Sequence, residues 1–367
     1  MVTERSRPFA VQLDPLTGAE VVRLTSEPVV QHHLYLTTRT CTLDGRYVVF
    51  VSHETGAPNL CCMETSTGEI RRLTYRKDLN PLSAVITSDD QAVLYTSRDA
   101  VLGATLPEGQ ETAIARFPGE RLGQLCPAPE GRFAAFNSSS GGRHRLTELD
   151  LYSGRARIVV DSPGPIGRVQ YDGGGERFLY SGEPGARVRV VDRDGSGDRL
   201  LYPQISGEWA THETWLNAAE VAFVKFHDGL YLSGLDGRLR TLFKGPIWHV
   251  AARADGRLLA CDTHAPDIGL ILISPSSGKW RTICHPHSSN KGKRWFEPLP
   301  SGAPVCGLPE TEPSAGGSES DYGPQWTHPH PSFHPDGRRV FFTSDAEGAP
   351  HVYRAGIPEE WLDELEG

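Results

Sequence analysis

The chain has 367 residues, of which 37 are Lys or Arg and 46 are Asp or Glu, so its formal net charge is −9. It contains no run of basic residues and no apolar stretch long enough to span a membrane, which argues against nucleic acid and lipid bilayers as partners. Glycine (39) and proline (28) are abundant, and helical periodicity is confined to residues 358–365. This composition is typical of an all-β protein.

The cysteines and the first residues bear on the compartment of the protein. Seven cysteines are scattered along the chain without a Cys-x-x-Cys spacing. An odd, dispersed set suits neither a disulfide framework nor a thiolate zinc site, so we expect reduced and mostly buried thiols. The first residues are polar and lack the apolar segment of a secretion signal. We therefore expect a cytoplasmic protein.

A turn followed by a short apolar strand recurs seven times along the chain. The copies begin at Asp44, Asp89, Glu130, Gly174, Ala218, Asp255 and Asp336. They are about 37 to 46 residues apart, except for a last interval of about 80, and this spacing is typical of propeller blades of four strands each. The repeat resembles that of TolB-type propellers. It predicts an all-β, seven-bladed β-propeller that forms a single domain over residues 1–367.

Two segments lie outside this repeat. The strand pattern at residues 19–24 precedes the first copy and has no blade of its own, so we expect it to complete the C-terminal blade and thereby close the ring. The long last interval is predicted to hold an inserted loop at residues 288–324, rich in Gly, Pro, Ser and Glu. Loops of this length are usually functional or disordered. Because it leads directly into Gln325, we expect it to border the active-site face.

The strongest chemical motif lies at the start of the last inner strand, where Gln325, His328 and His330 fall within six residues. Side chains two residues apart on an extended backbone point the same way, so two imidazoles and an amide oxygen can converge. These donors are neutral, so a bound divalent cation would keep its charge and could attract an anionic ligand. A bare His-x-His is more often a surface pair, so the interpretation depends on the other blades.

The other blades contribute similar residues at the starts of their inner strands, which open onto one face around the central channel. His249 lies one blade before the motif and is the natural fourth ligand. His212 lies one blade further round and is a candidate proton acceptor, since neutral imidazole suits that task. Arg187 lies in a turn and can pair with a carboxylate or a developing oxyanion. The predicted substrate contacts are His32, His33, Tyr35, Arg39 and Arg168.

These motifs resemble those of the oligogalacturonate lyases, seven-bladed propeller enzymes of the polysaccharide lyase type. The resemblance spans residues 18–359 and is most specific at residues 325–333. It implies that His249, Gln325, His328 and His330 bind manganese, or another divalent cation, that His212 is the base, and that Arg187 assists at the substrate carboxylate. The implied reaction is β-elimination on an acidic oligosaccharide: the base removes the C5 proton of a uronic acid and leaves an unsaturated product.

Other interpretations stay open. Compared with that family, the loops of the third and of the fifth to sixth blades are short and the segment before Gln325 is long, so a different uronate could be the substrate. A non-catalytic TolB-like propeller that binds other proteins is the alternative function. A hydrolase is less well supported, because propeller lactonases use acidic residues around calcium and glycosidases need a pair of carboxylates. His285 and His287 repeat the His-x-His spacing without a preceding glutamine, and we expect no metal there.

Overall fold

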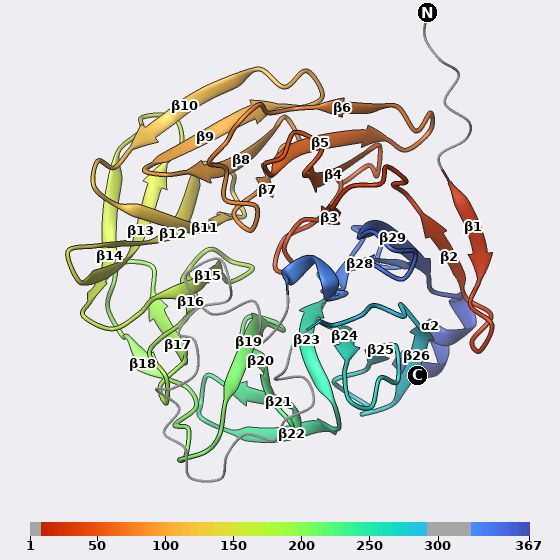
Figure 1. The fold of residues 1–367 in the computed structure, drawn as a ribbon. Coiled ribbons are helices and arrows are strands. Elements are labelled where there is room, and N and C mark those ends of the chain that lie inside the picture. The colour runs from red at the N-terminus through yellow and green to blue at the C-terminus, as the bar shows by residue number, and fades with distance from the viewer. Residues whose placement is uncertain (1–8, 292–323) are drawn as a thin grey trace, which may run out of the picture.

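The computed structural model describes residues 9–291 and 324–367, and it is a ring of seven antiparallel sheets around a central axis (Figure 1). The predicted seven-bladed β-propeller is thereby confirmed. We number the blades 1 to 7 in chain order from the sheet that begins with β3. Each blade is a meander that starts at the centre of the ring and ends at its rim.

The first three blades have the following strands. Blade 1 consists of β3 (Gln31–His33), β4 (Tyr47–Ser52), β5 (Asn59–Glu64) and β6 (Ile70–Arg72). Blade 2 consists of β7 (Val85–Ile86), β8 (Ala92–Ser97), β9 (Ala100–Thr105) and β10 (Glu111–Arg116). Blade 3 consists of β11 (Arg121–Pro127), β12 (Phe133–Ser140), β13 (Arg143–Asp150) and β14 (Ala156–Ser162).

The next three blades follow the same plan. Blade 4 consists of β15 (Gly167–Tyr171), β16 (Arg177–Ser181), β17 (Val188–Asp192) and β18 (Arg199–Leu200). Blade 5 consists of β19 (Ala210–Trp215), β20 (Glu220–Lys225), β21 (Gly229–Gly234) and β22 (Leu239–Lys244). Blade 6 consists of β23 (Ile247–Ala252), β24 (Leu259–Thr263), β25 (Leu270–Ile273) and β26 (Trp280–Cys284).

Blade 7 joins the two ends of the chain. It contains β27 (Ser332–Phe333), β28 (Arg339–Ser344) and β29 (His351–Gly356), followed by β2 (Glu20–Arg23) and β1 (Ala10–Leu13) from the N-terminal part. Strand β2 pairs antiparallel with β29, with Val21 opposite Ala355. The predicted closure of the ring is thus confirmed, and β1 adds a fifth strand that the sequence analysis did not anticipate.

The hydrophobic core is divided among the interfaces between neighbouring blades. Strands in the middle of a blade are buried on both faces, so they read as continuous apolar runs, as β4 and β8 do. One core cluster, for example, joins Val224 and Leu232 of blade 5 to Val250 and Cys261 of blade 6. The outermost strands β10, β14 and β22 are largely exposed. Burial of the blade faces against one another therefore holds the ring together.

The turn between the first two strands of a blade packs against the preceding blade. In blade 6 this turn contains Gly256, whose φ of +70° lies in the left-handed region that favours glycine. A Cβ atom there would lie 2.5 Å from the carbonyl oxygen of Leu216 in blade 5. The recurring Asp-Gly turns are therefore contact points between blades as well as chain reversals.

Bulges near the starts of several inner strands turn side chains toward the channel. The pairing of β15 shifts register between Gly167 and Gln170, that of β19 between Thr211 and Thr214, and that of β23 between Ile247 and Val250. Inside two of these bulges, Arg168 and His212 have φ values of +48° and +51°. Such backbone is costly for residues other than glycine and is concentrated at functional sites.

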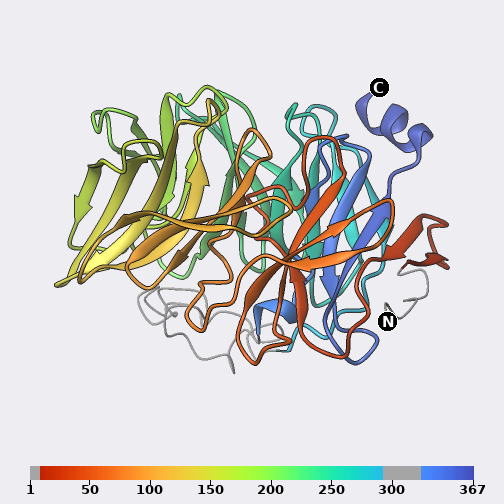
Figure 2. The same ribbon diagram turned by 90° about the horizontal axis from the view of Figure 1, so that it is seen from above.

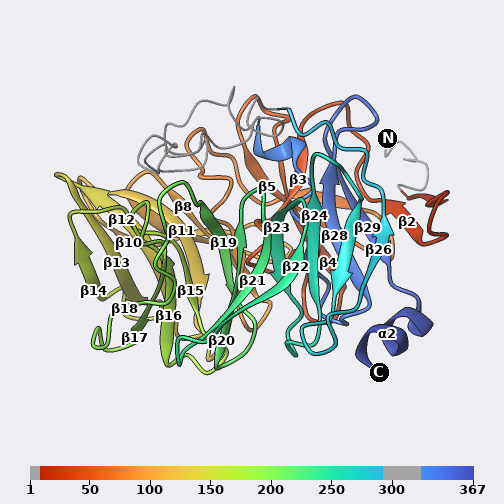
Figure 3. The same cartoon turned by 90° about the horizontal axis from the view of Figure 1, so that it is seen from below.

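Two short helices lie on opposite faces of the ring (Figures 2 and 3). The 3-10 turn η4 (Gln325–Thr327) leads into β27 and is the blue turn near the centre of Figure 1. The C-terminal helix α2 (Glu359–Glu366) packs Trp361, Leu362 and Leu365 into the core cluster shared by blades 6 and 7. Neither helix in the described ranges is long and apolar enough to cross a membrane.

Some predictions concern residues outside the described ranges. The inserted loop predicted at residues 288–324 lies almost entirely there, as does Cys306. The six cysteines within the described ranges are free, and all are buried except the half-buried Cys126. The expected burial of the thiols is therefore confirmed for five of these six cysteines.

Ring closure can be tested at Val22 of β2, whose side chain is 3% exposed and packs with Phe341 and Val352. We expect Val22→Ala to lower the free energy of unfolding by roughly 2 kcal/mol, because two methyl groups leave a closely packed interface. Val11 in the neighbouring strand β1 is 60% exposed, so Val11→Ala should change it by less than about 0.5 kcal/mol. Denaturant unfolding measures both, and equal effects would contradict the closure role of β2.

Candidate metal centre

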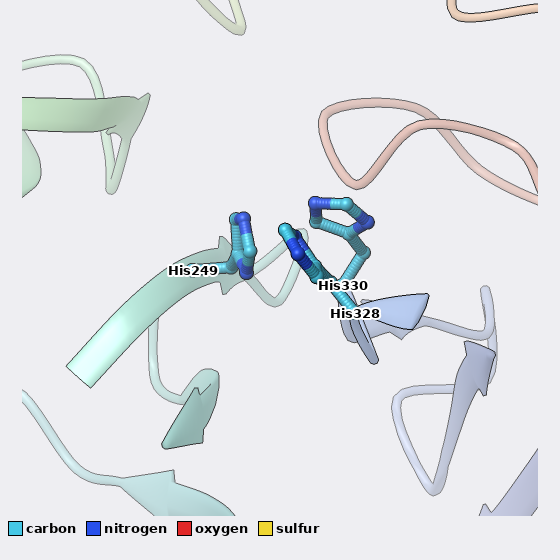
Figure 4. Close-up of side chains that lie close together, drawn as sticks. All are labelled: His249, His328 and His330. Atoms are coloured by element: carbon cyan, nitrogen blue, oxygen red, sulfur yellow. The ribbon is translucent and has the colours of Figure 1, made fainter. Parts of the chain in front are cut away.

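Three histidines from two neighbouring blades converge beside the central channel (Figure 4). His249 lies near the start of β23, and His328 and His330 lie between η4 and β27. One ring nitrogen of each lies within 4.8 Å of those of the others, and all three residues are buried. No other group of three or more potential ligands of this kind occurs among residues 9–291 and 324–367. The structure thus brings together three of the four predicted metal ligands.

A buried carboxylate, Asp262 on β24, holds the two sides of this cluster in place. Its Oδ1 accepts the backbone N–H of His249 (2.8 Å), and its Oδ2 accepts the ring Nδ1–H of His249 (2.7 Å) and the backbone N–H of His330 (3.0 Å). Because Nδ1 of His249 carries this proton, Nε2 is the nitrogen that can bind a cation. Carboxylates that orient a ligating imidazole in this way are a common feature of metal centres.

Burial controls the charge of these groups. It lowers the pKa of His249 well below its ordinary value, and the neighbouring His330 and His212 act in the same direction. The ring is therefore neutral, which is the form that binds metals. Burial also raises the pKa of Asp262 to about 8, although the N–H groups of His249 and His330 favour its charged form. A cation in the cluster would favour that charged form further.

Gln325 is the fourth donor that the sequence predicts. It begins η4, and the backbone N–H of His328 donates to its carbonyl oxygen at 3.1 Å. Its side-chain Oε1 is buried and has no hydrogen-bond partner within the described structure. A buried amide oxygen without a partner is costly unless a ligand satisfies it. Three imidazoles and an amide oxygen are donors that a divalent transition-metal ion accepts.

His33 supports this loop from within the protein. Its Nε2 lies 2.6 Å from the carbonyl oxygen of His330, and its Nδ1 lies 2.7 Å from Oγ1 of Thr343. The carbonyl can only accept, so Nε2 carries the proton and Nδ1 accepts from the hydroxyl. Burial lowers the pKa of His33 to about 4, which keeps the ring neutral. Both nitrogens are thus engaged within the protein, and the substrate contact predicted for His33 stays a prediction.

The predicted base lies against the metal cluster. The ring centroid of His212 is 4.3 Å from that of His249. Nη2 of Arg168 lies 3.3 Å from Nε2 of His212, and Nε of Arg168 donates to the hydroxyl of Tyr35 at 3.1 Å. The Tyr35 ring in turn lies 5.8 Å from that of His330. Residues of blades 1, 4, 5, 6 and 7 therefore meet at one site.

The other predicted site residues are placed as follows. His32 lies beside η4, where its ring is 6.4 Å from the ring of Trp326 and 5.9 Å from that of His53. Arg187 is 7% exposed and lies in the turn between β16 and β17, at the end of blade 4 where the inner strand begins. The substrate contact predicted for His32 and the role predicted for Arg187 stay predictions.

Arg39 is not brought to this site. It pairs with Asp90 and donates to the carbonyl oxygen of Thr87, both in the turn between β7 and β8. That turn follows the inner strand of blade 2, so it lies at the end of the strands opposite to His249 and His330. The predicted substrate contact of Arg39 is corrected accordingly: its partner in the structure is Asp90.

Two residues at the centre were not identified from the sequence, namely Asp262 and Thr343. Asp262 is carried by the second strand of blade 6, which pairs with β23 through Val250 opposite Cys261. Thr343 lies on β28 of blade 7. In the sequence, Asp262 stands out as an acidic residue within an otherwise apolar strand. The sequence does not show that it contacts His249, because that contact depends on the bulge in β23.

The fold and the site together define a seven-bladed propeller with a histidine cluster at the starts of its inner strands. No protein-family profile matches the chain. It is 25% identical over 403 residues to the oligogalacturonate lyase of Dickeya dadantii (strain 3937), and 25% identical over 404 residues to the oligogalacturonide lyase of Pectobacterium atrosepticum. Each alignment covers 96% of both proteins. The resemblance to oligogalacturonate lyases is thus confirmed along nearly the whole chain.

Solved structures agree with this result. The crystal structure of an oligogalacturonate lyase from Vibrio parahaemolyticus superposes with a TM-score of 0.81 at 22% sequence identity, covering 96% of this chain and 97% of that one. A structure of an oligogalacturonate lyase in complex with manganese gives the same values. At this identity the superpositions establish the fold of the chain.

The part played by Asp262 can be tested with Asp262→Asn. We expect its Mn²⁺ affinity to fall about 10- to 100-fold, because the amide cannot accept all three hydrogen bonds that orient His249 and His330. Isothermal titration calorimetry measures the affinity. Asp255→Asn is the matched control, since Asp255 lies in the turn at the opposite end of the same blade and pairs with Arg253. An Asp262→Asn variant with unchanged affinity would contradict this role.

Proposed function

We propose that the protein is a metal-dependent lyase that cleaves oligogalacturonate, an acidic oligosaccharide, by β-elimination. The observation that carries the proposal is the contact between the candidate base and the histidine cluster, with ring centroids 4.3 Å apart for His212 and His249. The alignment with oligogalacturonate lyases over 96% of the chain supports the same reaction class.

We propose Mn²⁺ as the cofactor, held by His249, His328, His330 and Gln325. The donor set is consistent with this ion, and one solved oligogalacturonate lyase is in complex with manganese. When bound, the cation supplies Lewis acidity that stabilises negative charge on the carboxylate of the substrate. The chain itself contributes neutral ligands, so the positive charge of the ion stays available to that carboxylate.

We assign the transfer of the C5 proton of the substrate to His212. The C5 proton of a uronic acid is weakly acidic, because its removal places charge next to a carboxylate. In the proposed reaction His212 accepts this proton, the C5–H electron pair forms the C4=C5 double bond, and the C4–O bond breaks. The departing oxygen takes a proton from solvent and becomes a new hydroxyl group. Arg187 is assigned to the substrate carboxylate, where a guanidinium can donate two hydrogen bonds.

The alternative of a non-catalytic protein-binding propeller accounts less well for the site. A protein-binding platform has no need for three buried imidazoles whose ring nitrogens lie within 4.8 Å of one another. Arg168 and His212 also adopt strained backbone in order to reach the channel. A lyase that acts on another uronate is distinguished by the choice of substrate in the following experiment.

The purified protein with Mn²⁺ should convert oligogalacturonate to a product whose new carbon–carbon double bond absorbs in the ultraviolet, and a chelator should abolish the reaction. Other oligouronates tested in parallel identify the preferred sugar, and we expect oligogalacturonate to react fastest. If Mn²⁺-loaded protein produced no absorbance change with any oligouronate, the proposed function would be wrong.

His212→Ala should lower kcat about 10²- to 10⁴-fold, the usual contribution of a positioned general base, and should leave the Mn²⁺ content unchanged. His330→Ala should instead lose the metal, as measured by elemental analysis. The control is His144→Ala, because His144 lies on β13 of blade 3, away from the cluster. Full turnover by His212→Ala would refute the assignment of the base.

A further inference from the structure

Arg168 reaches the central channel from blade 4 and is 9% exposed. Each of its three nitrogens donates a hydrogen bond: Nε to the hydroxyl of Tyr35 (3.1 Å), Nη1 to Oγ1 of Thr211 (3.2 Å) and Nη2 to Nε2 of His212 (3.3 Å). These partners come from blades 1 and 5. The guanidinium therefore links the candidate base to a residue carried by a distant blade.

The bond to His212 determines where that imidazole carries its proton. A guanidinium has no acceptor, so Nε2 of His212 must be the accepting nitrogen. In the neutral ring the proton then lies on Nδ1, and Nε2 is the basic nitrogen. As long as Arg168 donates to it, the lone pair of Nε2 is engaged and cannot take a proton from carbon.

We propose that Arg168 is a positioning residue that engages the basic nitrogen of His212 until the carboxylate of a uronic acid draws its guanidinium away. The inference rests on the function proposed above. A carboxylate is a stronger acceptor for a guanidinium than an imidazole is, because the hydrogen bond is then charge-assisted on both sides. The 3.3 Å bond to His212 is at the long end of the usual range, so exchanging it costs little.

Geometry limits this exchange to a small movement. Tyr35 and Thr211 accept from Nε and Nη1, so the hydrogen bond of Nη2 to His212 can change partner while these two bonds are kept. The Tyr35 ring also contacts the ring of His330, which keeps the guanidinium anchored next to the candidate metal centre. The acid group of the sugar would thus select the substrate and free the base in one step, whereas a neutral or esterified sugar would leave His212 engaged.

Nitrogen NMR tests whether Arg168 exchanges its hydrogen bond to His212 for one to a carboxylate, and it does not require turnover. The probe is protein with ¹⁵N-labelled histidine, loaded with diamagnetic Zn²⁺, which accepts imidazole ligands, and the His212 signals are assigned by their loss in His212→Ala. We expect monomeric galacturonate to shift the Nε2 resonance toward that of an imidazole nitrogen without a hydrogen bond, and galactose to leave it unchanged. In Arg168→Met the resonance should already lie there and should not respond. A wild-type resonance unaffected by galacturonate would overturn the proposal.

Steady-state kinetics distinguish a positioning role of Arg168 from a purely structural role. Arg168→Met should lower kcat/KM for oligogalacturonate about 100-fold, and it should lower kcat/KM for the methyl-esterified oligomer much less. Arg168→Lys should retain part of the preference for the acid, and it replaces Arg168→Met if that variant does not fold. Arg238→Met is the control, since the Arg238 side chain is 91% exposed. An equal loss on both substrates at an unchanged unfolding midpoint would overturn the proposal.

The two proposals fail in different ways. If the protein cleaves no oligouronate, the lyase function is wrong, and the response of the His212 resonance to galacturonate still decides whether the guanidinium changes partner. If it cleaves oligogalacturonate while that resonance stays fixed, the function stands and the role of Arg168 is wrong.

Discussion

The site depends on the Asp262 carboxylate, which binds the ring and backbone of His249 on one blade and the backbone of His330 on the next. This carboxylate fixes the tautomer of one ligand and the position of the loop that carries the other two. It can do so because blade 6 and the inner edge of blade 7 are neighbours in the ring. The packing of blade 6 against blade 7 and the assembly of the candidate metal centre therefore depend on each other.

Burial gives the site its chemical character. It keeps His249 and His33 neutral, so one imidazole is available to a cation and the other supports the loop of His330. The positive φ values of Arg168, His212 and His330 cost of order 1–3 kcal/mol each. Packing between the blades offsets this strain, and the strained residues are those that meet around the channel. The fold thus tolerates a lower conformational stability at these residues, and their side chains are thereby placed on one face of the ring.

The repeat of turn and apolar strand was sufficient to predict seven blades, because burial on both faces of a blade leaves a strong periodic signal. It also identified which residues begin the inner strands, and so it predicted that His249, His328 and His330 would meet. The repeat does not reveal bulges or the directions of side chains. The repeat therefore predicts a substrate contact for Arg39, which in the structure lies at the other end of the strands and pairs with Asp90. Asp262 was missed because its role depends on pairing across a bulge.

The central claim is that His249, His328, His330 and Gln325 hold one divalent cation. Anomalous X-ray diffraction at the manganese absorption edge, on crystals of the protein grown with Mn²⁺, tests it most directly. We predict a single strong anomalous peak between the three imidazoles, within bonding distance of Nε2 of His249 and Oε1 of Gln325. A peak elsewhere, or no peak among these side chains at saturating Mn²⁺, would contradict the account.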